Sequence, residues 1–322
     1  MSEENKNQMY TDIVEFYEEH TNMDFPVGIY YVELQKMYME CVRWQWHNEL
    51  EIDYVRSGEA IFEIGEETVR VSAGSAVLVN GNRIHSIHSE QPEKCVILSI
   101  LFHPDFIFDS SESFLSLKYK EPILTNPDFK FVTFTPASPW GKRGIECINA
   151  IINTNLHKNH GYELLTRSYL CNLWIQLLEK DAQEMQTKTA SVLSILDEDR
   201  VKQAILYIHA NYAKPLTLDN IAESIHVSKS ECCRCFKRSM RLTPFEYLMK
   251  HRIFESARKM QRNEQAADSI SSLASSVGFN NSSYYNKIFR KYLHCTPTEY
   301  REEIKKNHRD ALSPFGISLA RM

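Results

Sequence analysis

The fold of the last third of the chain is decided by the stretch Ile270-Ser-Ser-Leu-Ala-Ser-Ser-Val-Gly-Phe-Asn-Asn-Ser-Ser-Tyr-Tyr-Asn-Lys-Ile-Phe-Arg-Lys291. Its apolar residues recur at helical spacing on either side of Gly278, which predicts two short helices joined by a tight turn. The second helix should begin at a polar cap, Asn280 or Asn281. Its expected core positions are Tyr285, Ile288 and Phe289.

The same pattern occurs once before in the chain. Leu218-x-x-Ile221-Ala222-x-x-Ile225 matches Ile270-x-x-Leu273-Ala274-x-x-Val277, 52 residues later (218 to 270). Downstream, Thr243-Pro244-x-Glu246-Tyr247 matches Thr296-Pro297-x-Glu299-Tyr300. A repeat of this kind indicates two copies of one supersecondary unit. We therefore predict two helix-turn-helix units, at about 217–238 and 269–291, the second helix of the first copy being capped by Ser228.

Each second helix carries polar and basic side chains opposite its core positions. In a major groove, such groups near a helix N-terminus can bond to base edges, while cations further along contact phosphate. The alternative is an ordinary solvated helix face. The candidate DNA contacts are Ser230, Cys233, Arg234 and Lys237 in the first copy, and Ser282, Ser283, Tyr284, Asn286, Lys287 and Arg290 in the second.

The net charge of −5 is the average of two unlike segments. Residues 1–199 carry 16 Lys/Arg against 31 Asp/Glu, a net of −15, whereas residues 200–310 carry 20 against 11, a net of +9. This division predicts that the basic segment meets an anionic polymer. The polar start and the lack of a long apolar run favour a cytoplasmic protein with no membrane partner.

The stretch at 270–291, with Thr-Pro-Thr-Glu-Tyr-Arg301 after it, resembles the signature of the AraC/XylS transcriptional regulators. The resemblance covers about a third of the chain. It implies that a long helix, about Pro244–Gln261, joins the two units and that their recognition helices enter successive major-groove segments. The family usually has Gly where this chain has His226, Arg241 and His294, so these residues should adopt left-handed backbone geometry at a cost.

Residues 27–108 predict an all-β barrel or sandwich, because short apolar runs alternate with turn signals every ~8–12 residues. The clearest runs are Trp44–Ile64, Ala76–Val79 and Cys95–Phe102. A short helix at about Gln8–Glu19 is expected ahead of the strands.

Two stretches resemble the motifs of a cupin barrel, Trp44 to Gly58 and Gly74 to His85. Strand parity places His47, Glu49, Glu51 and Asp53 on one face. Metal-binding cupins would use His47, Glu51 and His85, but Gln45 stands where they usually have another His. We expect no metal or other cofactor, and instead a small polar ligand such as a sugar; a polar barrel mouth without a ligand is the alternative. The candidate ligand-binding residues are Trp44, Trp46, His47, Glu49, Glu51 and His85.

From Gly144 onward the apolar period becomes helical, with a break at His160-Gly161. The predicted fold is therefore an α+β multidomain chain: a cupin-like β-barrel at 1–135, a helical hairpin at 136–180 that packs on the barrel or forms a homodimer, a linker at 181–199, and an all-α DNA-binding domain at 200–310.

These patterns predict a sequence-specific DNA-binding transcription regulator with an effector-binding barrel, and no catalytic residues. Its partners would be double-stranded DNA, a small-molecule effector, a second copy of the chain and, for an activator, RNA polymerase. The alternatives are a metal-dependent cupin enzyme with a DNA-binding tail and a sequence-blind architectural DNA binder. The clustered Cys232, Cys233 and Cys235 suggest either buried core residues or a thiol switch, for which Cys233 is best placed.

Overall fold

The computed structural model describes residues 25–108, 113–126, 128–184, 192–261, 269–307 and 317–318. The chain divides into two compact units, one formed by residues 1–195 with 317–322, the other by residues 196–316. The helix expected at Gln8–Glu19 lies outside the described residues.

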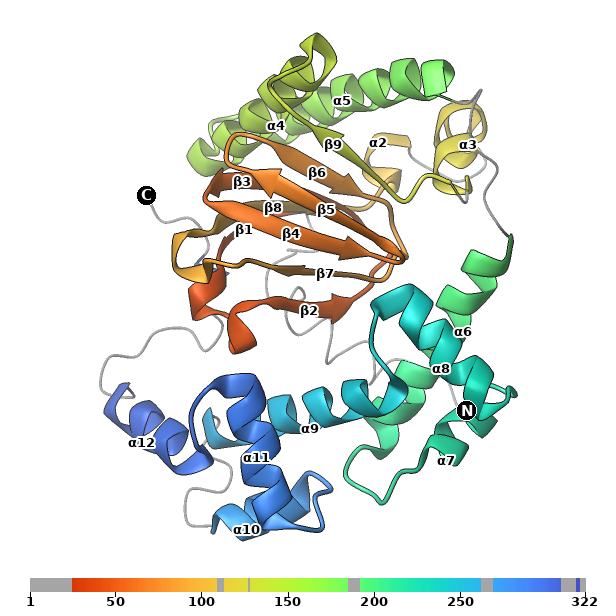
Figure 1. The fold of residues 1–322 in the computed structure, drawn as a ribbon. Coiled ribbons are helices and arrows are strands. Elements are labelled where there is room, and N and C mark those ends of the chain that lie inside the picture. Colours follow the sequence, from red (N-terminus) through yellow and green to blue (C-terminus); the bar gives the residue numbers. More distant parts are fainter. Residues whose placement is uncertain are drawn as a thin grey trace. The chain divides into compact units, whose positions relative to one another are not determined.

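The first unit contains two antiparallel sheets, which confirms the predicted β-barrel class (Figure 1). The six-stranded sheet has the order β10-β1-β8-β3-β6-β9, and the four-stranded sheet has the order β2-β7-β4-β5. The strands are β1 (Val27–Glu33), β2 (Val42–Gln45), β3 (Leu50–Ser57), β4 (Glu59–Ile64), β5 (Glu67–Ser72), β6 (Ala76–Val79), β7 (His85–His88), β8 (Val96–Phe102), β9 (Phe131–Phe134) and β10 (Ile317–Ser318).

Strand β3 is buried on both of its faces, whereas a strand of alternating polarity usually has one face in water. Leu50 and Ile52 belong to the main hydrophobic core. Glu51 and Asp53 alternate with them and line a pocket together with residues of both sheets. The polar face of this strand is therefore enclosed within the barrel.

Two long helices, α4 (Pro139–His157) and α5 (Tyr162–Glu184), cover the six-stranded sheet (Figure 1). They form the predicted hairpin. Their apolar stripe packs on the sheet, and a Cβ atom at Gly144 would come within 2.2 Å of the Phe134 ring, so a small residue is required there. Shorter helices complete the unit: η1 (Leu34–Lys36), η2 (Tyr38–Glu40), η3 (Pro92–Lys94), α2 (Asp105–Phe108), η4 (Ser116–Lys120) and α3 (Glu121–Leu124).

The second unit is helical, as predicted. Its helices are α6 (Val192–Asn211), α7 (Leu218–Ser224), α8 (Lys229–Met240), α9 (Pro244–Gln261), α10 (Ile270–Ser276), α11 (Ser282–Leu293) and α12 (Pro297–Asn307). The bounds of α9 coincide with those expected for the linking helix.

The prediction of a linker at 181–199 is wrong at both ends, because α5 extends to Glu184 and α6 begins at Val192. The polar composition of Asp181–Thr189 suggested the linker, and α6 begins three residues after that segment. Asp197 is in fact buried, and its Oδ2 atom lies 2.6 Å from a guanidinium nitrogen of Arg238 on α8. A charged residue can occupy a helix interface when it is paired in this way.

The three positions where glycine was expected adopt the left-handed conformation that we predicted. The φ angles of His226, Arg241 and His294 are 54°, 55° and 58°. Arg241 and His294 end α8 and α11 as their C-caps. In the second helix-turn-helix unit the turn has a glycine, Gly278. A Cβ atom there would lie 2.5 Å from the Tyr212 carbonyl oxygen.

Candidate nucleic-acid interface and ligand pocket

Helices α8 and α11 begin at the side-chain caps that the sequence indicates. The Ser228 hydroxyl accepts a hydrogen bond from the Glu231 backbone N–H (3.2 Å). Of the two candidates in the second copy, Asn281 is the cap, since its Oδ1 accepts from the Tyr284 N–H (3.0 Å). Each cap satisfies a backbone donor in the first turn and fixes where the helix starts.

One face of each helix is buried, and the residues on it are those predicted from periodicity: Cys232, Cys235 and Phe236 on α8, and Tyr285, Ile288 and Phe289 on α11. The candidate DNA contacts all lie outside this core. Cys233 and Ser282 are half-buried, and the remainder are exposed, including Tyr284 at 43%.

Several cations of α8 have partners within the helix. Arg234 pairs with Glu231 one turn away, and Arg238 lies 3.2 Å from the same carboxylate. Lys237 Nζ donates to the Arg241 carbonyl oxygen at 3.2 Å. Glu231 was not anticipated as part of this face, and it would have to release Arg234 before that side chain could meet a base or a phosphate.

Helix α9 lies between the two helix-turn-helix units in the sequence and makes polar contacts on both sides. The Arg252 guanidinium donates to the carbonyl oxygens of Tyr212 and Lys214, both at 2.8 Å. On the other side, the Ser256 and Tyr285 hydroxyls share a hydrogen bond. These bonds fix α9 against the segment between α6 and α7 on one side and against α11 on the other, because buried hydrogen bonds are costly to break.

The cysteines of α8 divide as their positions suggest. Burial raises the pKa of the Cys232 thiol to about 12, and burial together with Asp197 raises that of Cys235 to about 11. Such thiols remain protonated and poorly reactive at neutral pH. Both residues therefore serve as small core side chains.

In the barrel, the structure brings together His47, Glu51 and His85, with one ligand-capable atom of each within 4.8 Å of the others. Glu51 Oε2 lies 3.0 Å from His47 Nε2 and 2.8 Å from His85 Nε2. The opposite ring nitrogens, both Nδ1, face the carbonyl oxygens of Glu49 and Arg83 at 3.0 and 2.8 Å. These three residues have the chemistry to hold a divalent transition metal.

Charge stabilisation within this trio offsets the cost of burial. Burial opposes ionisation of Glu51, but the charges and hydrogen bonds of His85 and His47 outweigh it and place the pKa of Glu51 well below its usual range. Burial also opposes charging of His47, yet the hydrogen bond and charge of Glu51 leave the His47 pKa raised. Opposite charges a few ångströms apart act in this way because the interior screens them weakly.

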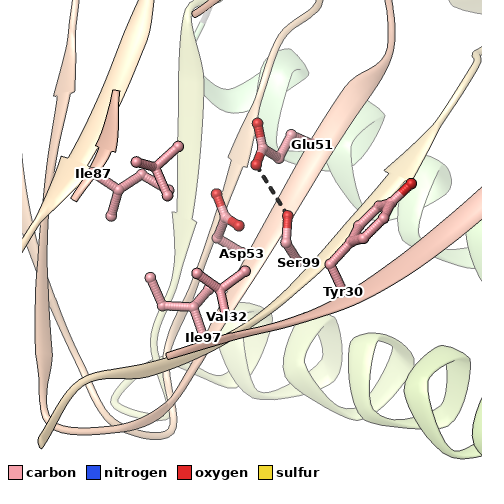
Figure 2. Close-up of a pocket in the computed structure, with 8 residues that line it drawn as sticks. Tyr30, Val32, Glu51, Asp53, Ile87, Ile97 and Ser99 are labelled. Atoms are coloured by element: carbon pink, nitrogen blue, oxygen red, sulfur yellow. Dashed lines mark hydrogen bonds between the residues drawn. The ribbon is translucent and has the colours of Figure 1, made fainter. Parts of the chain in front are cut away.

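A small pocket lies next to Glu51, between the two sheets (Figure 2). Figure 2 shows the Asp53 carboxyl group beside Glu51 and Ser99, with the apolar side chains of Ile87, Val32 and Ile97 around it. The pocket is lined by Tyr30, Val32, Val42, Glu51, Asp53, Ile87, Ile97 and Ser99. Of the candidate ligand-binding residues, Glu51 alone is among them.

The other pocket residues come from strands that are distant in sequence. The register pairs Tyr30 with Ser99 and Ser99 with Asp53 across β1, β8 and β3. For Asp53, strand parity predicted its place on the same face as Glu51. No sequence pattern predicted Tyr30 and Ser99 as pocket residues, since nothing in their local sequence identifies their neighbours. The half-buried Trp44 and Trp46 are not part of this pocket.

Comparison with known families places both halves of the chain. Residues 26–173 match the model of the AraC-like ligand binding domain, and residues 221–303 match that of a helix-turn-helix domain. The HTH-type transcriptional regulator YdeC of Bacillus subtilis is 27% identical over 290 residues, which cover 88% of this chain and 94% of that protein. A regulator encoded in the cgkA 5′ region of Pseudoalteromonas carrageenovora is 32% identical over 126 residues, 39% of this chain and 72% of that one.

Among solved structures, ToxT from Vibrio cholerae O395 aligns over 88% of this chain and 99% of its own, with 14% identity and a TM-score of 0.41. The fold, the two matched domains and the relatives define a DNA-binding transcription regulator with a ligand-binding domain. The chain belongs to the AraC family of transcriptional regulators. Among the described helices, none has the length and apolar character needed to cross a membrane.

Proposed function

We propose that this regulator recognises a specific operator through the outer faces of α8 and α11, and that a small polar ligand in the barrel controls this recognition. The observation that carries the proposal is the pair of matched helices, each with a buried core face and an exposed polar and basic face. Base readout falls to Ser230, Cys233 and Arg234 on α8, and to Ser282, Ser283, Tyr284 and Lys287 on α11. Lys237, Asn286 and Arg290 contact the backbone further along.

The barrel is the proposed sensor, because its interior presents polar groups that a ligand could bind. A sugar or related metabolite would meet the carboxylate and imidazole groups of Glu51, His47 and His85. Ligand binding would alter DNA recognition only to the extent that the ligand prefers one conformation of the chain. The enzyme alternative draws no support from the relatives, which are regulators.

A second copy of the chain is the proposed partner for helix α5. Leu164, Leu165 and Ile175 are exposed on this helix, Leu164 at 74%, although its other face packs on the sheet. Exposed apolar side chains on one helix face are typical of a protein interface. Two DNA-binding units in one dimer would bind two half-sites with a gain from effective concentration. An activator would also contact RNA polymerase.

The DNA assignment predicts that Arg234→Ala and Lys287→Ala weaken binding to the operator far more than binding to random DNA. Each base contact is worth about 1–3 kcal/mol, so we expect losses of roughly 5- to 150-fold on the operator. Dissociation constants for both DNAs, measured at several salt concentrations, test this. Operator fragments can be selected from random duplexes with the wild-type protein.

The matched control is Arg70→Ala, which removes one exposed positive charge from β5 in the first unit and should leave both affinities unchanged. Equal losses of affinity for both DNAs would indicate that Arg234 and Lys287 contact phosphates and not bases. Unchanged operator binding in both variants would show that the recognition surface lies elsewhere.

A further inference from the structure

Glu231 lies in the first turn of the recognition helix α8. Its backbone N–H donates to the Ser228 hydroxyl that caps the helix. The equivalent residue of α11 is Tyr284, whose backbone N–H donates to the cap Asn281. Tyr284 is among the residues proposed above to contact base edges, and residues near the start of a recognition helix are the ones that meet bases. The repeat therefore gives Glu231 the position of a base-reading residue.

Glu231 differs from Tyr284 because it lies against two arginines of its own helix. Its Oε2 pairs with a guanidinium nitrogen of Arg234, and its Oε1 lies 3.2 Å from one of Arg238. Arg238 is in turn fixed by the buried carboxylate of Asp197 on α6, at 2.6 Å. The Oε1 atom is thus held by an anchored partner, whereas Oε2 is engaged by a side chain on the outer face.

The ion pair between Glu231 and Arg234 can be exchanged for other partners at little cost. The side chain of Arg234 is 65% exposed and that of Glu231 is 25% exposed. Pairs that solvent screens in this way add little to stability. If a guanine bound Arg234 through its O6 and N7 atoms, the Oε2 atom of Glu231 would face the groove and would need a new donor.

The charge of Glu231 restricts which base can supply that donor. Burial opposes its ionisation, but the hydrogen bonds and charges of Arg234 and Arg238 outweigh burial and lower the pKa of Glu231. An ionised carboxylate only accepts hydrogen bonds. In the major groove guanine and thymine present acceptors, adenine presents an acceptor beside its amino group, and cytosine presents its amino group alone. Cytosine is therefore the base that suits this carboxylate.

We propose that Glu231 is a further base-reading residue of α8 and that it selects a cytosine in the operator. This inference rests on the proposed function, since it requires α8 to lie in a major groove. On binding, Arg234 would pass from Glu231 to a guanine, and Glu231 Oε2 would accept from the N4 amino group of a cytosine. Both charged groups would then keep a partner, whereas a wrong base would leave the carboxylate facing an acceptor.

The two bases should lie close together in the operator. Residues three apart in a helix are separated by about 4.5 Å along its axis, and base pairs are stacked about 3.4 Å apart. The cytosine and the guanine should therefore belong to one base pair or to two neighbouring pairs.

Selection of bound duplexes from a random library by the full-length chain tests the inference. The wild-type protein should prefer cytosine at one operator position by about 10-fold, as expected for one good base contact. Glu231→Gln should lose this preference and favour adenine instead, because a glutamine amide matches the N6 and N7 atoms of adenine. The preferences at positions read by α11 should not change, which provides the check that the variant is folded.

Asp219→Asn is the matched control. Asp219 lies on α7 of the same helix-turn-helix unit, and its carboxylate is 2.8 Å from Lys229 Nζ, so this change also removes one ion-paired negative charge. It should leave every base preference as in the wild type. On an operator with the cytosine changed to adenine, the wild type and Asp219→Asn should bind about 10-fold more weakly, and Glu231→Gln should bind no more weakly.

A cytosine preference that survives in Glu231→Gln, or that is lost equally in Asp219→Asn, would overturn the inference. A wild-type operator without such a cytosine would also overturn it. A uniform gain in affinity for all duplexes in Glu231→Gln would do the same, since Glu231 would then only compete with DNA for Arg234. If the wild-type chain selected no sequence at all, the proposed function would fail, and this inference with it.

Discussion

Glu51 and Asp53 lie two residues apart on β3, and the barrel interior shifts the pKa values of their carboxyl groups in opposite directions. Both are buried, so solvent exposure does not distinguish them. Burial raises the pKa of both carboxyl groups. Two histidines reverse this effect for Glu51, whereas the charge of Glu51 adds to it for Asp53. The opposite signs of the two pKa shifts therefore depend on whether neighbouring groups oppose or reinforce the effect of burial.

These shifts predict opposite effects of two isosteric changes on stability. The folded-state pKa of Asp53 is raised, so the wild-type chain loses stability as pH rises above about 3.8, the ordinary value. Asp53→Asn should therefore raise the free energy of unfolding at pH 7 by about 1–2 kcal/mol, and the gain should shrink as pH falls towards 4. Urea unfolding at a series of pH values measures it.

Glu51→Gln serves as the matched control. The folded-state pKa of Glu51 is lowered, so its contribution is present above about pH 4.5 and is lost as pH falls below that value. Its replacement should cost about 3 kcal/mol at pH 6, because it leaves His47 and His85 without their shared partner. A destabilising Asp53→Asn at neutral pH would contradict our account of the pocket.

At the scale of elements, the repeated Thr-Pro-x-Glu-Tyr sequence is a pair of capping boxes at the starts of α9 and α12. Glu246 Oε2 accepts from the Thr243 backbone N–H at 2.7 Å, and the Thr243 hydroxyl accepts from the Glu246 N–H at 3.2 Å. Thr296 and Glu299 repeat both contacts. The sequence identity between the copies thus has a local cause, since each helix must start at a fixed residue after the recognition helix.

This account predicts non-additive losses at the start of α9. Thr243→Ala and Glu246→Ala should each lower the free energy of unfolding by about 1 kcal/mol, and the double variant should lose clearly less than their sum because the two side chains act together. Chemical denaturation of the four proteins provides the cycle. Simple additivity would indicate that Glu246 acts independently of the cap, for example through Lys237, 3.7 Å away.

The elements that were predicted well are those defined by nearby residues. Caps, helical period and the repeat located α8 and α11, the family resemblance implied α9, and apolar runs between turn signals located β6 and β8. By contrast, β9 and the pocket could not be read from the sequence, because they depend on strand order and register. Tyr30, Asp53 and Ser99 become neighbours only when β1, β8 and β3 pair, and no local pattern encodes that pairing.

For the whole molecule, the division of charge follows the division into units. The acidic segment forms the barrel and its helical hairpin. The basic segment forms the helices that we propose bind DNA. The average charge was therefore a poor guide to the partner, whereas the charge of each unit is informative.

The dimer proposal predicts that Leu164→Glu combined with Ile175→Glu separates the copies. Each change occurs twice in a twofold interface and removes apolar contact worth about 1.5–3 kcal/mol per side chain, so the dimer dissociation constant should rise on the order of 100-fold or more. Sedimentation velocity measures the mass. Phe245→Glu, an equally drastic change at an exposed position in the second unit, should leave the dimer intact. A double variant with the wild-type mass would rule out α5 as the interface.

Strand β10 gives the chain an unusual path. Ile317 and Ser318 pair with Val32 and Tyr31 of β1, so the polypeptide leaves the first unit near residue 195 and returns to it after residue 316. The DNA-binding unit is therefore inserted into the sensor as a loop. Its N-terminal end continues directly from the first unit, and its C-terminal end is joined to that unit through the two-residue strand β10. Because loop-closure entropy grows only slowly with length, pairing β10 with β1 closes this long loop at little more entropic cost than a shorter one. If this pairing opened, the inserted unit would be joined to the sensor at one end only.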